Sequence, residues 1–409
     1  MRILMLSQWF DPEPTFKGLS FAQELVRRGH DVQVLTGFPN YPEGKLYPGY
    51  RIRLWQRETL DGIPVYRVPL YPSHDRSAAR RTINYLSFAA SALVLGPMLV
   101  QKPDIIYVYN LITLAPAAWC LKHLTGAAVV YDIQDLWPES VTASGMVDGR
   151  FSTILGLLCN LAYRTADQVV TLSPGIRDEL RRRGVPEDRV TVIYNWCNEQ
   201  DMQSDEYDLA LAKRLGLAGK FSVMYAGNLG LAQALDAVIE AAALLRETHP
   251  DIQFVFVGDG ADSTRLKTIT EQRCLTNIEF VPRQPAVAMG RILRLADVLL
   301  VHLKDDPLFR ITIPSKTQAY LAAGRPILMG VRGDAAELVR RSKGGVTCEP
   351  GNAASIAQAV LQLYGLSAVD RAAMGLAGSR YYEQELSMEA GVSRFESCFQ
   401  AALGCKRRA

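Results

Sequence analysis

The 409-residue sequence has no paired cysteines and few histidines. Its seven cysteines are scattered without a Cys-x-x-Cys pair, and it contains five histidines. An odd, unpaired set of cysteines is typical of a reducing compartment, and the missing pairs argue against structural zinc. The net charge of +3 is too small to indicate a nucleic-acid binder. We therefore expect a cytoplasmic protein with no metal site and no nucleic-acid partner.

The sequence also lacks an apolar run that would cross a bilayer comfortably. The longest run, residues 86–100, is interrupted by Pro97, whereas a spanning helix needs about 20 apolar residues. Two interpretations stay open for this stretch: a buried helix, or a helix lying at the membrane face. The N-terminal stretch MRILMLSQWF is a predicted strand rather than a signal peptide. Clusters of basic residues occur at 80–81, 181–183, 340–341 and 406–408. Such clusters are usually solvated helix faces, but they can also contact anionic lipids.

Familiar nucleotide and metal motifs are missing as well. No Gly-x-x-x-x-Gly-Lys-[Ser/Thr] loop occurs, which excludes a P-loop ATPase, and no glycine turn completes Gly-x-Gly-x-x-Gly. There is no Asp-x-Asp motif. Because lysine, arginine and helix ends can neutralise a diphosphate, we expect neither a metal nor another cofactor.

Short apolar strands alternate with amphipathic helices along the chain, the rhythm of doubly wound parallel sheets. The polar segment 195–208 interrupts this rhythm and is interpreted as a linker. We predict an α/β fold with two Rossmann-like domains, residues 1–195 and 196–384, and a terminal helix, 385–409, that packs back on the first domain. The predicted strands are 3–7, 32–36, 65–68, 105–109, 129–132, 169–172, 190–193, 221–227, 252–258, 278–281, 297–301, 326–329 and 345–348.

Two turns of the second predicted domain favour a phosphate-bearing ligand. Gly227–Gly230 lies between a strand and a helix, where backbone N–H groups can cradle a phosphate. Asn228 and Gln233 offer neutral donors there. In Gly258–Gly260, which follows the next strand, Asp259 lies between two glycines, and the open backbone leaves room for a flat base.

A third turn, in IPSKTQAYLAAGRPI (313–327), places a lysine at the start of a predicted helix. Ser315 is the predicted N-cap, and Gly324 follows the helix end. Lys316 next to the positive end of the helix dipole is unfavourable by a few tenths of a kcal/mol, roughly, unless an external anion binds there. The alternative is a solvated lysine in a surface turn. Together with Thr317, these residues predict a nucleotide-diphosphate site in a group-transfer enzyme.

These features in this order resemble the retaining, nucleotide-sugar-dependent GT-B glycosyltransferases of family 4. Within that family, the sequence is most similar to the bacterial branch that builds O-antigen, capsule and exopolysaccharide, including L-fucosamine (FucNAc) transferases. The similarity covers essentially the whole chain. It is most specific in RRGHDVQVLTGFPNYPEGKLYPGY (27–50), YDIQDLWPES (131–140), AGNLG (226–230) and IPSKTQAYLAAGRPIL (313–328). The resemblance implies two parallel sheets that face each other across a cleft.

The resemblance also assigns donor-binding positions. The family's Gly-Gly pair after the first strand corresponds here to Lys17-Gly18. Its arginine and lysine after the first strand of the second domain correspond to Asn228 and Gln233. Since those two cations are missing, Lys316 and Arg283 are the expected replacements on the diphosphate.

The sequence departs from the family pattern in its carboxylates. The two glutamates of the Glu-x7-Glu pair fall at Ile311 and Ala319, and the histidine after the fourth strand is replaced by Tyr109-Asn110. Gln318 is then the expected contact for the ribose, and Asp305 or Asp306 are candidates near the sugar. Either this branch builds the same site from different groups, or the protein has lost activity; we favour the former.

The catalytic prediction rests on the motif DIQDLWPES. Retaining transfer needs stabilisation of the leaving diphosphate and of an oxocarbenium-like sugar. Asp135 and Glu139 are the candidates for steering the acceptor, although both residue types also cap helices. Trp137 is more simply explained as core, and His302 as a buried polar contact.

The resemblance finally implies the substrates and location. The donor is expected to be a UDP-sugar, N-acetylated, and the acceptor a glycan on a polyprenyl diphosphate. The protein would be peripheral on the inner face of the cytoplasmic membrane. Two alternatives stay open. The first is a UDP-sugar epimerase of the same fold, which needs acid and base groups, whereas this chain has few histidines. The second is a non-catalytic protein that binds a nucleotide-sugar and assists another transferase.

Overall fold

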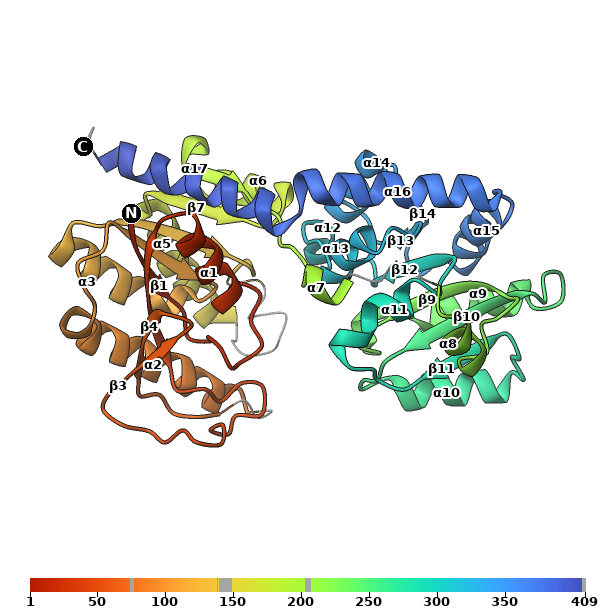
Figure 1. The fold of residues 1–409 in the computed structure, drawn as a ribbon, viewed down its shortest axis with the longest axis horizontal. Helices are drawn as coiled ribbons and strands as arrows, with labels where there is room; N and C mark the ends of the chain where they lie inside the picture. Colours follow the sequence, from red (N-terminus) through yellow and green to blue (C-terminus); the bar gives the residue numbers. More distant parts are fainter. Residues whose placement is uncertain (74–76, 138, 140–148, 203–206, 407–409) are drawn as a thin grey trace. The chain divides into compact units, whose positions relative to one another are not determined.

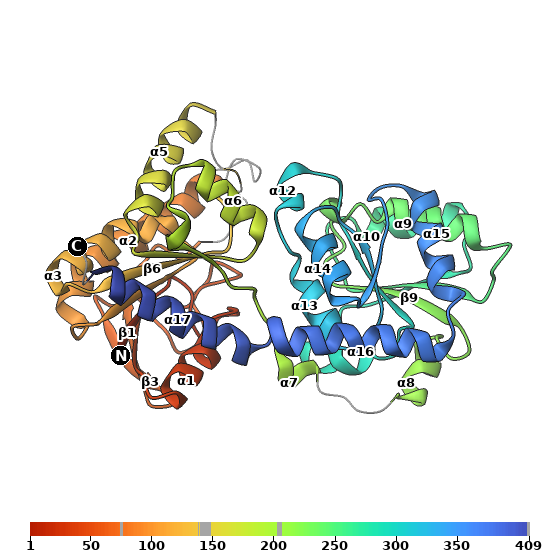
Figure 2. The ribbon, with the colours of Figure 1, turned by 90° about the horizontal axis from the view of Figure 1, so that it is seen from above.

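The computed structural model describes residues 1–73, 77–137, 139, 149–202 and 207–406. The chain divides into two compact units (Figures 1 and 2). Unit 1 contains Met1–Ile193 and Val392–Ala409, and unit 2 contains Tyr194–Gly391. The first boundary thus follows Ile193 rather than residue 195. The chain returns to unit 1 at Val392, inside helix α17 (Met388–Lys406), rather than at residue 385.

Unit 1 is built on an eight-stranded sheet in the order β3-β4-β2-β1-β5-β6-β7-β8. Every pairing is parallel except that of β3 with β4. The predicted parallel sheet therefore gains an antiparallel edge strand that the sequence analysis missed, because its alternating residues are mostly polar. The strands are β1 (Arg2–Leu6), β2 (Asp31–Gly37), β3 (Gln56–Leu60), β4 (Ile63–Val68), β5 (Ile105–Tyr109), β6 (Ala128–Ile133), β7 (Gln168–Thr171) and β8 (Val190–Val192).

Helices cover both faces of this sheet. Gly96 of α2 lies next to Leu35, which shares a sheet face with Leu6 and Val108. The neighbouring Tyr107 points to the opposite face, where its ring meets Phe395 of α17 at 5.6 Å. The helices of unit 1 are α1 (Leu19–Arg27), α2 (Ala78–Leu99), α3 (Ala115–Thr125), α5 (Gly149–Thr165) and α6 (Pro174–Arg182), together with the part of α17 from Val392 onward.

Unit 2 contains a six-stranded parallel sheet in the order β11-β10-β9-β12-β13-β14. Its strands are β9 (Phe221–Ala226), β10 (Ile252–Val257), β11 (Ile278–Val281), β12 (Val298–His302), β13 (Ile327–Gly330) and β14 (Gly345–Thr347). Its helices are α7 (Glu199–Met202), α8 (Leu209–Arg214), α9 (Asp236–Leu245), α10 (Ser263–Gln272), α11 (Met289–Leu293), α12 (Pro307–Arg310), α13 (Ser315–Ala322), α14 (Asp334–Ser342), α15 (Ala353–Tyr364) and α16 (Ala368–Glu385).

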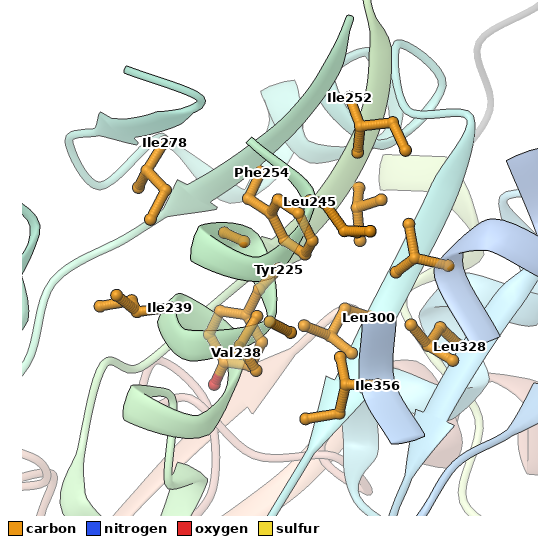
Figure 3. Packing of buried hydrophobic residues seen from close by; sticks show 14 of the residues in the cluster. Tyr225, Val238, Ile239, Leu245, Ile252, Phe254, Ile278, Leu300, Leu328 and Ile356 are labelled. Carbon is orange, nitrogen blue, oxygen red and sulfur yellow. The ribbon is translucent and has the colours of Figure 1, made fainter. Parts of the chain in front are cut away.

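The core of unit 2 lies between one face of this sheet and helices α9 and α15 (Figure 3). Alternate residues of the central strands, such as Phe254 and Leu300, point into it, where Val238 and Ile356 meet them from the helices. Burying one such side chain contributes about 1.5–3 kcal/mol. This core fixes the strands, and with them the loops at their carboxyl ends.

The predicted linker 195–208 is only partly a linker. Its described residues include helix α7, and Cys197 is tied to α16 because its N–H donates to the Tyr382 hydroxyl at 3.1 Å. Gly391 packs so closely on Trp196 that a Cβ there would lie 2.6 Å from the indole ring. The segment before α8 is therefore part of unit 2, although its polar sequence shows no apolar period.

Candidate active site

The loops after β9 and β10 interlock at the carboxyl edge of the unit 2 sheet. The Leu229 N–H donates to the Asp259 carbonyl at 3.0 Å, and the Asp262 N–H donates back to the Leu229 carbonyl at 2.9 Å. The Tyr225 hydroxyl donates to the carbonyl of Asn228 at 2.7 Å. The two predicted glycine turns are thus joined at this edge of the sheet.

Gly227 and Gly258 are required by this close approach. Their φ angles are +140° and +139°, a region that side chains strongly disfavour. A Cβ on Gly258 would lie 2.0 Å from the Gly227 carbonyl oxygen, and one on Gly227 would lie 2.4 Å from Cε of Lys316. The glycines therefore let the second loop, and Lys316, pack directly on the first.

Lys316 is the cation of this edge. Its Nζ lies 4.6 Å from the centroid of the Tyr225 ring, and within the described residues it has no carboxylate partner or hydrogen bond. Burial lowers the pKa of its ammonium to about 8. A partly buried lysine without a counter-ion, at a helix start and above a glycine turn, is arranged to receive an anion.

The neighbours of Lys316 in the sequence behave differently. Pro314, not Ser315, is the N-cap of α13, and the exposed Ser315 makes no capping bond. Thr317 and Gln318 are buried, and the Gln318 amide lies 3.0 Å from the carbonyls of Pro314 and Ser315. The structure corrects the donor-binding prediction for these two, because both side chains point into the protein.

The remaining unit 2 candidates lie at the same edge. Asn228 and Asp259 are exposed, and the Gln233 side chain accepts the Gly230 N–H at 3.1 Å. Arg283 follows β11, the edge strand beyond β10, and is exposed. Gln233 therefore shapes the turn, while Asn228, Asp259 and Arg283 present groups to solvent.

His302 and the aspartates after β12 have structural partners. His302 is buried, with Nδ1 2.7 Å from the Gln233 carbonyl and Nε2 accepting the Gly351 N–H at 3.1 Å. Burial lowers its pKa, so it is a neutral link between loops, as expected. Asp305 is held by Arg310 and Arg332, and Asp306 caps α12. Neither aspartate is the free carboxylate that the sequence suggested near the sugar.

The Lys17 ammonium is buried inside unit 1 and is not exposed at the carboxyl edge of the sheet. Its Nζ forms a buried ion pair with Asp132 at 2.6 Å, and the side chains are 1% and 0% exposed. The Tyr107 hydroxyl also donates to Asp132 at 2.6 Å, and the Phe395 ring of α17 covers the ammonium at 4.9 Å. This overturns the prediction that Lys17 binds the donor, because its charge is already neutralised inside unit 1.

The neighbouring Gly18 also faces a group of the protein itself. The Leu19 N–H at the start of α1 donates to the Asp11 carboxylate at 2.7 Å, and a Cβ on Gly18 would lie 2.3 Å from that carboxylate. Arg67 holds this loop by donating to the Asp11 carbonyl at 2.5 Å. The start of α1 therefore already carries a negative charge, which corrects the predicted role of Gly18 beside the phosphates.

The two predicted catalytic residues, Asp135 and Glu139, have different surroundings in the structure. Glu139 pairs with Arg183 at 2.5 Å, and Arg183 also donates to the Trp137 carbonyl at 2.9 Å. The Glu139 carboxylate is thus held by Arg183, the residue that follows α6, which corrects its assignment as a catalytic group. Asp135 is exposed after β6, although nearby protein atoms raise the pKa of its carboxyl by desolvation. Trp137 is buried, as predicted.

The sequence analysis missed an aromatic group at the unit 1 edge. Trp9, Tyr41 and Tyr85 come together there from three separate segments. The only local signal was a polar strand end followed by tryptophan. Among the described residues, no three His, Cys, Asp or Glu side chains are grouped to hold a metal ion.

Two α/β units, one with a lysine and interlocked glycine turns at its carboxyl edge, are the parts expected of a GT-B glycosyltransferase. Residues 19–196 match the model of a glycosyl transferase 4-like domain, and residues 211–376 match that of glycosyl transferases group 1.

The chain belongs to glycosyltransferase family 4. It is 31% identical over 338 residues to the putative colanic acid biosynthesis glycosyl transferase WcaI of Escherichia coli K12, an alignment that covers 79% of this chain and 82% of WcaI. It is also 23% identical over 290 residues to the probable glycosyltransferase WbjE of Pseudomonas aeruginosa, covering 69% and 70% of the two chains.

Solved structures share the fold. HepE of Anabaena in complex with UDP has a TM-score of 0.70 at 17% identity, covering 98% of this chain and 100% of HepE. The α,α-trehalose 6-phosphate synthase of Burkholderia multivorans has a TM-score of 0.72 at 14% identity, covering 100% and 98%. These neighbours establish the two-domain GT-B fold.

Proposed function

We propose that this glycosyltransferase transfers a sugar from a UDP-sugar to a lipid-linked glycan in surface polysaccharide biosynthesis, with retention. The observation that carries the donor assignment is Lys316, whose ammonium lies above the Gly227 turn and has no counter-ion among the described residues. HepE, which shares the fold, has been solved with UDP and with UDP-glucose. The name of WcaI supports a role in polysaccharide synthesis.

In this proposal the chain itself supplies the stabilisation of the leaving group. The Lys316 ammonium would receive the diphosphate charge as the glycosidic bond breaks, whereas most N–H groups of the glycine turns already donate within the protein. Asp135 is the carboxylate left to orient the acceptor hydroxyl. That the sugar is N-acetylated, FucNAc in particular, stays a prediction. Membership of the family favours transfer over epimerisation or a purely binding role.

Nucleotide binding tests the proposed donor. We expect UDP to raise the melting temperature and to bind in calorimetry clearly more tightly than GDP or ADP, in buffer containing EDTA because no metal is expected. Selection of GDP or ADP would refute the UDP assignment. Absence of binding by all three nucleotides would refute the donor site and favour a protein without turnover.

We further propose that α2 carries unit 1 to the anionic cytoplasmic membrane surface. This helix satisfies the length and apolarity of a membrane span, yet only 28% of its most apolar window is buried. The apolar run is thus helical but buried on one side only. On its other side Leu86, Val94 and Met98 are 54%, 65% and 80% exposed. The exposed Arg80 and Lys102 lie near its two ends, which suits anionic headgroups.

Vesicle binding tests the α2 stripe. We expect the protein to cosediment with phosphatidylglycerol vesicles, and Val94→Asp to weaken binding by about tenfold or more, because a charge in the apolar boundary costs about 2 kcal/mol or more. Leu244→Asp is the matched control, since Leu244 is similarly exposed, at 57%, but lies in unit 2. Equal loss in both variants, or equal binding of Val94→Asp and wild type, would refute this surface.

A further inference from the structure

Three aromatic rings form a cluster at the carboxyl edge of the unit 1 sheet, named here the aromatic platform. Trp9 follows β1, Tyr41 lies in the loop after β2, and Tyr85 lies on α2. The Trp9 ring centroid is 5.4 Å from that of Tyr41, tilted by 46°, and 6.0 Å from that of Tyr85, edge-on at 83°. All three rings are only partly buried, so part of their surface faces the edge where ligands of such sheets bind.

A buried polar network fixes Tyr41 in the platform. The Glu13 carboxylate accepts the N–H groups of Asn40 and Tyr41, both at 2.7 Å, and that of Phe10 at 3.2 Å. The Tyr47 hydroxyl donates to the Tyr41 carbonyl at 2.9 Å. The loop is therefore held in one arrangement before any ligand arrives.

A second buried contact fixes Tyr85 relative to Trp9. Asn84 of α2 accepts a hydrogen bond from the Gln8 side chain at 2.5 Å and donates to the Asn40 side chain at 3.3 Å. Because Asn84 precedes Tyr85 and Gln8 precedes Trp9, this contact joins the backbones that carry both rings. Such preorganisation lowers the entropic cost of binding.

A cation and a carboxylate lie next to these rings. Arg81 is one turn before Tyr85 on α2, and its buried Nε has no hydrogen-bond partner among the described residues. Burial raises the pKa of the Tyr85 phenol, the positive charge of Arg81 opposes that shift, and Asp135 contributes to it. The Oε1 of Gln8 is also buried without a partner in the described chain.

We propose that the aromatic platform stacks a sugar ring of the acceptor, and that Arg81 binds a negative charge beside that ring. Ring C–H groups pack well on aromatic faces, and hydroxyl groups suit the exposed Asp135 carboxylate. The anion is a phosphate or a sugar carboxylate, which present the same chemistry to a guanidinium. The identity of this ligand as the acceptor rests on the proposed function.

Saturation-transfer NMR on the full chain tests the platform. The probes are α-D-glucose 1-phosphate, D-glucuronate and methyl α-D-glucoside, with UDP in excess to occupy the donor site. We expect saturation of the sugar ring protons to fall about fivefold or more in Trp9→Ala and Tyr85→Ala, and to persist in Tyr85→Phe, because the ring supplies the contact. Trp119→Ala, which removes a tryptophan that is 59% exposed on α3, is the control and should match wild type.

The charged probes separate the two sources of the anion. Arg81→Gln should reduce saturation of a charged probe and leave methyl α-D-glucoside unchanged. Loss for glucose 1-phosphate alone identifies a phosphate partner, and loss for glucuronate alone identifies an acidic sugar. An equal effect on all three probes would overturn the role of Arg81.

Two results would overturn the platform itself. One is unchanged saturation in Trp9→Ala, and the other is saturation that disappears in Lys316→Ala, which would place the sugar at the unit 2 edge. Wild-type hydrogen exchange in the peptides of unit 1 shows that each unit 1 variant is folded. If UDP binds but saturation of the sugar protons is unchanged in Trp9→Ala, only the aromatic platform is wrong. If UDP does not bind, the proposed function itself is wrong.

Discussion

Replacing Lys316 by alanine is expected to lower kcat/KM for the donor by about a hundredfold or more. Its ammonium is the charge that the described unit 2 edge places above the Gly227 turn without a counter-ion. Removing one preorganised group that stabilises developing negative charge costs on the order of 10²–10³ in rate. The measurement is steady-state transfer, or UDP affinity by calorimetry.

The matched control is Lys304→Ala. Lys304 is also a lysine of unit 2, but it is 54% exposed and lies near Asp306 at 3.6 Å, so its loss should change the rate by about twofold at most. Lys316→Arg keeps a charge and should retain more activity than Lys316→Ala. Comparable activity of Lys316→Ala and Lys304→Ala would contradict the donor site proposed here.

The same lysine should make donor binding depend on pH. With burial lowering the pKa of Lys316 to about 8, the free protein loses this charge as the pH rises above that value. The diphosphate binds the ammonium form, so UDP affinity should fall by up to about tenfold per pH unit above pH 8. Lys316→Arg, which stays charged, should show a flat profile between pH 7.5 and 9.

Breaking the Lys17–Asp132 pair is expected to destabilise unit 1 strongly. Asp132→Ala leaves the Lys17 ammonium buried without its counter-ion and removes the acceptor of the Tyr107 hydroxyl. Removing one partner of a buried ion pair typically costs about 3–5 kcal/mol. Hydrogen exchange measured by mass spectrometry reports this loss separately for peptides of unit 1 and unit 2.

Two variants make the stability test specific. Lys17→Met combined with Asp132→Leu replaces the pair by apolar groups and should lose less stability than Asp132→Ala, because no uncompensated charge remains. Glu337→Ala breaks the exposed pair with Arg340, whose side chains are 58% and 56% exposed, and should cost about 0.5 kcal/mol or less. If Asp132→Ala behaves like Glu337→Ala, the buried pair does not stabilise unit 1.

The residues that the sequence indicated at the unit 2 edge are those marked by local features. A glycine after a strand is recognised because backbone angles such as +140° at Gly227 disfavour any other residue. A lysine at a helix start is noticeable because it opposes the helix dipole. Lys316 and the two glycine turns were therefore found from single segments.

The errors came from residues whose role depends on distant partners. Lys17 is 115 positions from Asp132, and nothing in FDPEPTFKGLS indicates a buried ion pair. Glu139 was assigned to chemistry from the motif DIQDLWPES alone, which does not indicate its partner Arg183, 44 positions further along the chain. Gln318 lies two residues after Lys316 in the sequence, but two helical steps of about 100° each turn it inward.

The sequence by itself determined the two α/β domains, the parallel pairing of the strands that it recognised and the place of Lys316 at a helix start, since these depend on periodicity and backbone geometry within short windows. Only the tertiary structure decided which charges are neutralised and which rings meet. Trp9, Tyr41 and Tyr85 come from three segments that the unit 1 sheet and α2 bring to one edge. Such neighbours in space are fixed by the packing of a whole domain, and no local pattern encodes them.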